Sequence, residues 1–73
     1  MHVYQTIGKE LAKPDNDKKQ LHKYHAEIED LVEADVIGIT GQGSKIRQII
    51  LSKESNVSEL ENWLGCELEL VEG

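Results

Sequence analysis

The sequence has little of what small secreted or membrane domains usually contain. It has a single cysteine, Cys66, in 73 residues, so no disulfide can form within the chain. Small secreted domains usually need disulfides to supplement a small core, so a reducing, cytoplasmic environment is expected. The longest apolar run is three residues (49–51), far short of the ~20 that span a membrane. The first residues also lack the basic-then-apolar order of a signal peptide.

Aromatic residues and cations are also scarce. There is no Phe, and the only aromatic residues are Tyr4, Tyr24 and Trp63, so the core is expected to be built from Ile, Leu and Val. The chain has eight Lys and Arg residues and fourteen Asp and Glu residues, which gives a net charge of −6. This charge repels nucleic-acid phosphates and favours a partner protein with a basic surface. With 38% hydrophobic residues, the chain is expected to fold as one α+β domain over residues 1–73.

Two segments show the apolar spacing of helices. Between residues 17 and 34 the apolar residues recur every three or four positions, which predicts a long helix with Asp15, Asn16 or Asp17 as its cap. Residues 55–64 predict a shorter helix that ends at Gly65. Its N-terminal cap is expected from Asn56 with Glu59, or from Ser58 with Glu61.

The remaining segments predict strands. Residues 35–40 and 45–52 flank a glycine-rich turn at 41–44, which indicates a hairpin. The isoleucines of 45–52 also fit helical spacing, but the preceding turn favours a strand. Residues 66–71 alternate, with Cys66, Leu68 and Leu70 predicted inward and Glu67 and Glu69 outward.

A weaker strand signal at residues 3–7 completes the order strand, helix, strand, strand, helix, strand. Right-handed crossovers then close the chain as a ferredoxin-like sandwich, with two helices on one face of an antiparallel sheet and the first and third strands central. Without that strand the domain is a helix-plus-three-strand unit. No internal repeat is apparent in the sequence.

No group of residues predicts catalysis or a bound cofactor. His22 and His25 lie three apart on the long helix, near Glu29, and could share a metal with Cys66, but no second ligand cluster supports such a site. A cysteine on an inward strand face is usually buried and inert. Since a chain of this size has little room for an enclosed pocket, we expect a protein that is not an enzyme and has no metal or cofactor.

Residues 40–49 resemble the nucleic-acid-clamping segment of KH domains. In that family a loop bracketed by glycines leads into a helix, and the resemblance implies nucleic-acid contacts by Gly41, Gln42, Gly43, Lys45 and Arg47. The first bracketing position is Thr40 in this chain, and the resemblance requires a helix where the hairpin reading expects a strand. A KH-like nucleic-acid-binding domain is therefore the alternative hypothesis.

The placement of charge on the long helix is its least ordinary feature. Lys18, Lys19 and Lys23 lie at its start and acidic residues lie at its end, the reverse of what the helix dipole favours. An acidic cluster held against this preference suits a surface that docks onto Lys and Arg of a partner. We therefore expect a non-enzymatic interaction module, a regulator, adaptor or inhibitor, with a homodimer left open. Its expected contacts are Glu27, Asp30, Glu33, Asp35, Glu67 and Glu69.

Overall fold

A computed structural model describes residues 1–14 and 18–73, which form four strands and two α-helices. In chain order the elements are β1 (His2–Thr6), a 3-10 helix η1 (Leu21–Tyr24), α1 (His25–Val32), β2 (Val36–Gln42), β3 (Lys45–Leu51), α2 (Ser58–Leu64) and β4 (Leu68–Glu72). All strand pairs are antiparallel. The expected α+β architecture, a four-stranded antiparallel sheet with two helices, is confirmed.

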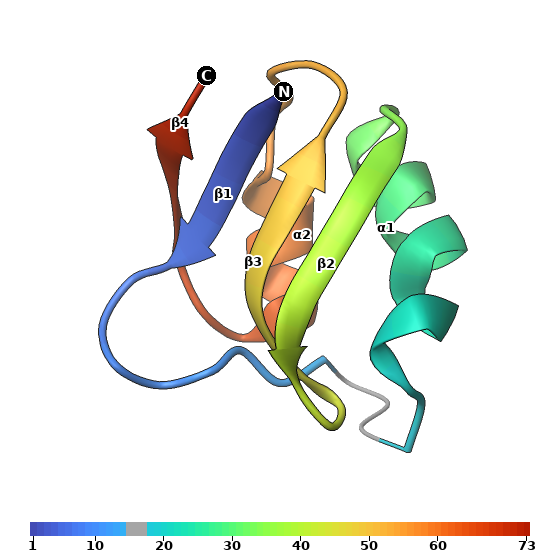
Figure 1. The fold of residues 1–73 in the computed structure, drawn as a ribbon, viewed down its shortest axis with the longest axis vertical. Coiled ribbons are helices and arrows are strands. Elements are labelled where there is room, and N and C mark those ends of the chain that lie inside the picture. Colours follow the sequence, from blue (N-terminus) through green and yellow to red (C-terminus); the bar gives the residue numbers. More distant parts are fainter. Residues whose placement is uncertain (15–17) are drawn as a thin grey trace.

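The sheet has the strand order β2-β3-β1-β4, so β1 and β3 occupy its two central positions. The N-terminal strand, which had the weakest sequence signal, pairs along its length with β3 on one side and β4 on the other. Both helices lie behind the sheet in the view of Figure 1, and no described element covers the other face. We call this uncovered side of the sheet the open face.

The core lies between the sheet and the helices and is mainly aliphatic, as expected. Three aromatic rings join it: Tyr4 is buried, and Tyr24 is fully buried and meets Trp63 edge-on, with ring centroids 5.2 Å apart. This contact connects η1 to α2. The buried apolar residues are Tyr4, Ala12, Tyr24, Ile28, Val32, Val36, Ile46, Ile49, Leu51, Leu60, Leu64 and Leu68.

The first helix is shorter than its apolar pattern predicted. The pattern implied a helix from residue 17 to 34, but the helical residues are 21–32, and their first turn is 3-10 rather than α. The proposed cap residues 15–17 lie outside the described residues. Lys18 and Lys19 precede the helix, so the expected lysine-loaded helix start is wrong for those two residues. Lys19 instead forms an ion pair with Glu27.

The hairpin at residues 36–51 is confirmed, but an irregularity in β3 changes which side chains share a face. Thr40 pairs with Gln48 and Gly41 with Ile46, so Arg47 is an extra residue in β3. This bulge turns Ile46 to the helix side, where it is buried together with Ile49 and Leu51. Simple strand alternation would place Ile46 on the same face as Ile50, and the bulge separates them.

Gly41 is required by this hairpin because the two strands approach closely at its position. A Cβ atom there would overlap the backbone oxygen of Lys45 and lie 2.9 Å from the Cα of Ile46. The turn itself contains Gly43, whose φ of 62° suits glycine. Gly41 therefore belongs to β2 rather than to the turn.

The second helix and last strand start later than predicted. α2 begins at Ser58 with no side-chain cap on its first turn, so neither expected reciprocal cap forms, although the Asn56 side chain accepts the Ser58 N–H at 2.9 Å. Gly65 ends α2 in the left-handed conformation, as predicted, with φ of 73°. Cys66 precedes β4 and is half-buried, not an inward strand residue, and Leu70 is 41% exposed.

The connection from helix to strand is built the same way twice, although no repeat is apparent in the sequence. Glu29 of α1 accepts the backbone N–H of Val36, seven residues on, at 3.1 Å. Glu61 of α2 accepts the N–H of Leu68, also seven residues on, at 2.7 Å. In both cases the residue four positions after the glutamate ends the helix with positive φ.

Candidate functional site: an acidic groove between the helices

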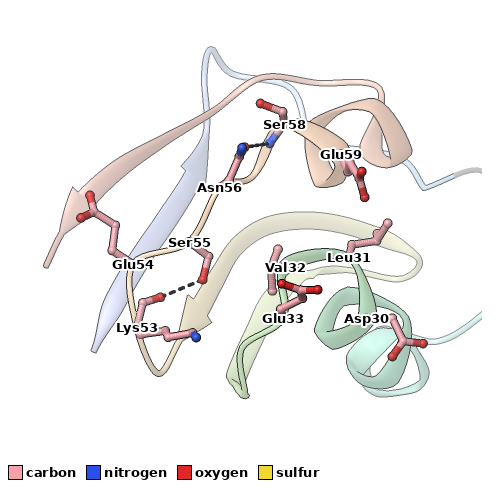
Figure 2. A pocket seen from close by; sticks show the side chains of 10 residues that line it. All are labelled: Asp30, Leu31, Val32, Glu33, Lys53, Glu54, Ser55, Asn56, Ser58 and Glu59. Carbon is pink, nitrogen blue, oxygen red and sulfur yellow. Dashed lines mark hydrogen bonds between the residues drawn. The ribbon is translucent and has the colours of Figure 1, made fainter.

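A hollow on the described surface lies where the end of α1 faces the β3–α2 loop and the start of α2 (Figure 2). Its volume is about 540 Å³. Four of its lining residues are acidic and one is basic, so the lining carries a net negative charge. We call it the acidic groove; it is lined by Asp30, Leu31, Val32, Glu33, Lys53, Glu54, Ser55, Asn56, Ser58 and Glu59.

The side chains that face the groove differ from those that only border it. In Figure 2 the side chains of Leu31 and Val32 point from α1 toward α2, and the Glu59 carboxylate comes down toward them from the other side. Asp30 and Glu54 direct their carboxylates away from the hollow. The groove thus has an aliphatic floor, with the Glu59 carboxylate over it and Glu33 next to Val32.

The loop wall of the groove is fixed by a residue from the opposite end of the chain. Tyr4 of β1 is 4% exposed, and its hydroxyl accepts the Ser55 N–H at 3.0 Å and donates to the Ser55 carbonyl at 3.3 Å. The Ser55 hydroxyl in turn donates to the Lys53 carbonyl at 3.3 Å. These bonds hold the backbone of the loop in place, so the wall is preorganised.

Glu33 is the only described non-glycine residue with positive φ, at 55°. It ends α1, and its N–H binds the Glu29 carbonyl at 2.8 Å. The matching position at the end of α2 is Gly65. A left-handed conformation costs a residue with a side chain about 1–2 kcal/mol. The backbone at Glu33 is therefore strained, and the residue lies in the lining of the groove.

The structure does not bring the six predicted acidic contacts together. Only Asp30 and Glu33 line the groove. Glu27 is paired with Lys19 at the start of α1, and Asp35 is exposed in the turn before β2, where its N–H and carbonyl bind Ser52. Glu67 and Glu69 are exposed near and within β4, as predicted, but on a different part of the surface.

The sequence interpretation missed Glu54 and Glu59 as neighbours of the predicted cluster. Glu59 joins Asp30 and Glu33 because α1 and α2 pack side by side, and Glu54 joins them through the loop between β3 and α2; the sequence pattern alone specifies neither arrangement. The sequence predicts Glu59 only as a helix-cap partner of Asn56, a role that it does not have. One feature indicates that Glu59 is available for contacts: it is an acidic residue, exposed in the first turn of a short helix.

The segment that resembles a KH domain is a β-hairpin. Gly41 and Gln42 end β2, Gly43 is in the turn, and Lys45 begins β3, so the helix required after the loop is absent. The Arg47 guanidinium donates to the carbonyls of Gly8 and Lys9, at 3.4 and 2.9 Å, and thereby holds the loop after β1. The structural requirement of the KH resemblance is not met.

The histidines and the cysteine do not converge. His22 is exposed in η1 and His25 begins α1, and among the described residues no three His, Cys, Asp or Glu side chains are close enough to hold a metal ion. Cys66 lines a second, shallower hollow of about 470 Å³ beside α2, and its thiol donates weakly to the Glu67 carbonyl at 3.5 Å.

Comparisons with known proteins give no relative: no family model, curated protein or solved structure matches the chain. Within the described residues, no helix is long and apolar enough to cross a membrane.

Proposed function

We propose that the protein is a non-enzymatic interaction module whose acidic groove binds a lysine or arginine side chain on the basic surface of a partner protein. The observation that carries the proposal is the combination of an aliphatic floor with a predominantly acidic lining in one hollow of about 540 Å³. We therefore expect the partner to contact the acidic groove rather than all six carboxylates predicted from the sequence.

The chemistry of the groove suits a long cationic side chain. Lys and Arg have an apolar stem and a charged head, and they commonly pack the stem on apolar surface while the head meets carboxylates. Leu31 and Val32 offer the apolar surface, and Glu33 and Glu59 offer the carboxylates. Lys53 also lines the groove and repels a second cation, which favours one inserted side chain over a dense basic cluster.

The strained backbone at Glu33 supports the same proposal. Residues held in an unfavourable conformation often serve a function, because the fold would otherwise accept a better residue. Gly65 occupies the matching position of α2 without this strain. A carboxylate at position 33 is thus retained although glycine fits the backbone better.

Titration of a short arginine-containing peptide into the ¹⁵N-labelled protein, followed by NMR, tests the proposal. We expect the largest shifts at Leu31–Glu33 and Ser55–Glu59, and binding that weakens as salt screens exposed charge pairs. A peptide with citrulline in place of arginine has nearly the same shape without the charge, and we expect it to bind at least ~5-fold more weakly.

Isosteric variants locate the binding surface. Glu33→Gln and Glu59→Gln each remove one groove carboxylate, and each is expected to weaken the arginine peptide ~2- to 5-fold, the range of an exposed ion pair. Glu69→Gln removes one charge outside the groove and is the matched control. Equal effects of all three variants, or shifts confined to other surfaces, would show that only the overall charge matters and would refute the groove.

Other observations bear on the fold, the location and the nucleic-acid alternative. We propose a ferredoxin-like sandwich, supported by the element order and by the central positions of β1 and β3. A cytoplasmic location rests on the single cysteine. The nucleic-acid alternative loses its main support with the strand at residues 45–51.

A further inference from the structure

The open face of the sheet combines a small apolar surface with polar side chains that already bind one another. Val3 and Ile50 are paired across β1 and β3, and Ile50 also lies over Gly38 of β2, where a Cβ would be 3.7 Å from the Ile50 Cδ1. Three further exposed aliphatic residues lie on or beside the strands: Ile7, Ile37 and Val71. Among the described residues no exposed large hydrophobic side chain lies on a helix.

A polar row crosses the open face next to this apolar pair. Gln48 donates from its amide nitrogen to the Gln5 side-chain oxygen at 2.8 Å, and its own amide oxygen accepts from the Thr40 hydroxyl at 3.4 Å. Polar side chains that are already hydrogen-bonded cost less to bury than unpaired ones. This row can therefore lose contact with water without leaving most of its groups unsatisfied.

We propose that the open face binds the open face of a second copy of the chain, forming a weak face-to-face dimer. The distribution of charge selects this occupant. Two copies with a net charge of −6 repel each other, so they can approach only where carboxylates are few. The paired positions of β2, β3 and β1 on this face carry none, and Glu69 and Glu72 lie on β4 at one edge.

The size of the face fits a weak dimer. The four neighbouring strands, each of five to seven residues, form a face that measures roughly 20 Å on each side. Two such faces together cover roughly 800 Å², which lies in the range of weak, transient interfaces below ~1,200 Å². Nucleic acid is disfavoured because Tyr4 and Tyr24 are buried on the helix side, leaving no described aromatic ring on this face for base stacking.

Sedimentation equilibrium over a protein concentration series, up to about 1 mM, measures the dimer directly. We expect the dimer to tighten ~3-fold or more at high salt, because screening reduces repulsion between the copies. This is opposite to the salt response proposed for the acidic groove. Concentration-dependent NMR shifts are expected at Val3, Gln5, Gln48 and Ile50.

Two isosteric variants test the interface. Gln48→Glu places a carboxylate at the centre of each face and is expected to raise the dimer Kd ~10-fold, while Gln20→Glu adds the same charge at an exposed residue before η1. Any one of three results would overturn the proposal. The protein is a monomer at every concentration, the two variants have equal effects, or the concentration-dependent NMR shifts are confined to the helices or to the outer edge of β2.

Discussion

The side chain of Glu61 in α2 accepts the backbone N–H of Leu68, the first residue of β4, at 2.7 Å. The bond closes the turn between helix and strand and gives a partner to an N–H that β1 does not use. Glu29 and Val36 make the same connection between α1 and β2 at 3.1 Å. Each of these glutamates therefore binds the first residue of a strand, a role that the sequence does not predict for either one.

Truncation of either glutamate is expected to destabilise the protein. Glu61→Ala and Glu29→Ala should each lower the free energy of unfolding by about 1.5–3 kcal/mol, the usual value of a hydrogen bond to a charged group. Glu61→Gln keeps an acceptor oxygen and should lose less than half of that. Urea unfolding measures the difference, and Glu59→Ala, at an exposed position of the same helix, is the control. An equal loss in that control would remove the special role of Glu61.

Replacement of Glu33 by glycine is expected to stabilise the fold and weaken binding. Glu33→Gly removes the cost of a side chain at φ of 55°, so thermal unfolding should occur at higher temperature, with a gain of about 1 kcal/mol. The same variant should weaken the arginine peptide, because a groove carboxylate is lost. Gly65→Ala makes the reverse change at the matching position and should cost about 1 kcal/mol. A less stable Glu33→Gly variant would contradict the strain argument.

The Tyr4 hydroxyl is expected to stabilise the groove wall from the far end of the chain. Tyr4→Phe removes the acceptor of the Ser55 N–H and should lower the free energy of unfolding by about 1–2 kcal/mol. Hydrogen exchange of the Ser55 amide should accelerate more than exchange in the centre of β3. Unchanged exchange at Ser55 would show that the wall does not depend on this bond.

The two glycines of the hairpin are expected to tolerate substitution differently. Gly41→Ala should destabilise the protein by about 3 kcal/mol, since its Cβ has no room beside the Lys45 backbone. Gly43→Asn should change stability by less than about 0.5 kcal/mol, because that position is open and asparagine tolerates positive φ. Thermal unfolding followed by circular dichroism measures the stability of each variant. Equal tolerance at both positions would contradict the close approach of the strands.

The sequence predicts those features of the fold that depend on neighbouring residues. Apolar spacing locates both helices, the glycine-rich turn locates the hairpin, and Gly65 ends α2 where expected. Glu67 and Glu69 are exposed as predicted, although Glu67 precedes β4 and every residue of β4 after Leu68 is exposed. Each of these features is determined by a few adjacent side chains and the geometry of one element.

Features that depend on distant contacts could not be predicted in the same way. The bulge at Arg47 depends on the carbonyls of Gly8 and Lys9, and it redirects Ile46 into the core. The acidic groove depends on how α1 and α2 pack, which brings Glu59 to the α1 carboxylates. The start of the first helix was predicted too early because residues 17–20 are all polar and carry no apolar spacing; the helical residues begin at Leu21, the first apolar residue of the pattern.

The position of β1 between β3 and β4 has a consequence for synthesis of the protein on the ribosome. The central strand β1 leaves the ribosome before both of its partners, which end at residues 51 and 72. Its hydrogen bonds on one side must therefore wait for the last strand, and contacts this distant in sequence form slowly. A nascent chain stalled before residue 68 would expose one edge of β1, a surface prone to pairing with other extended chains.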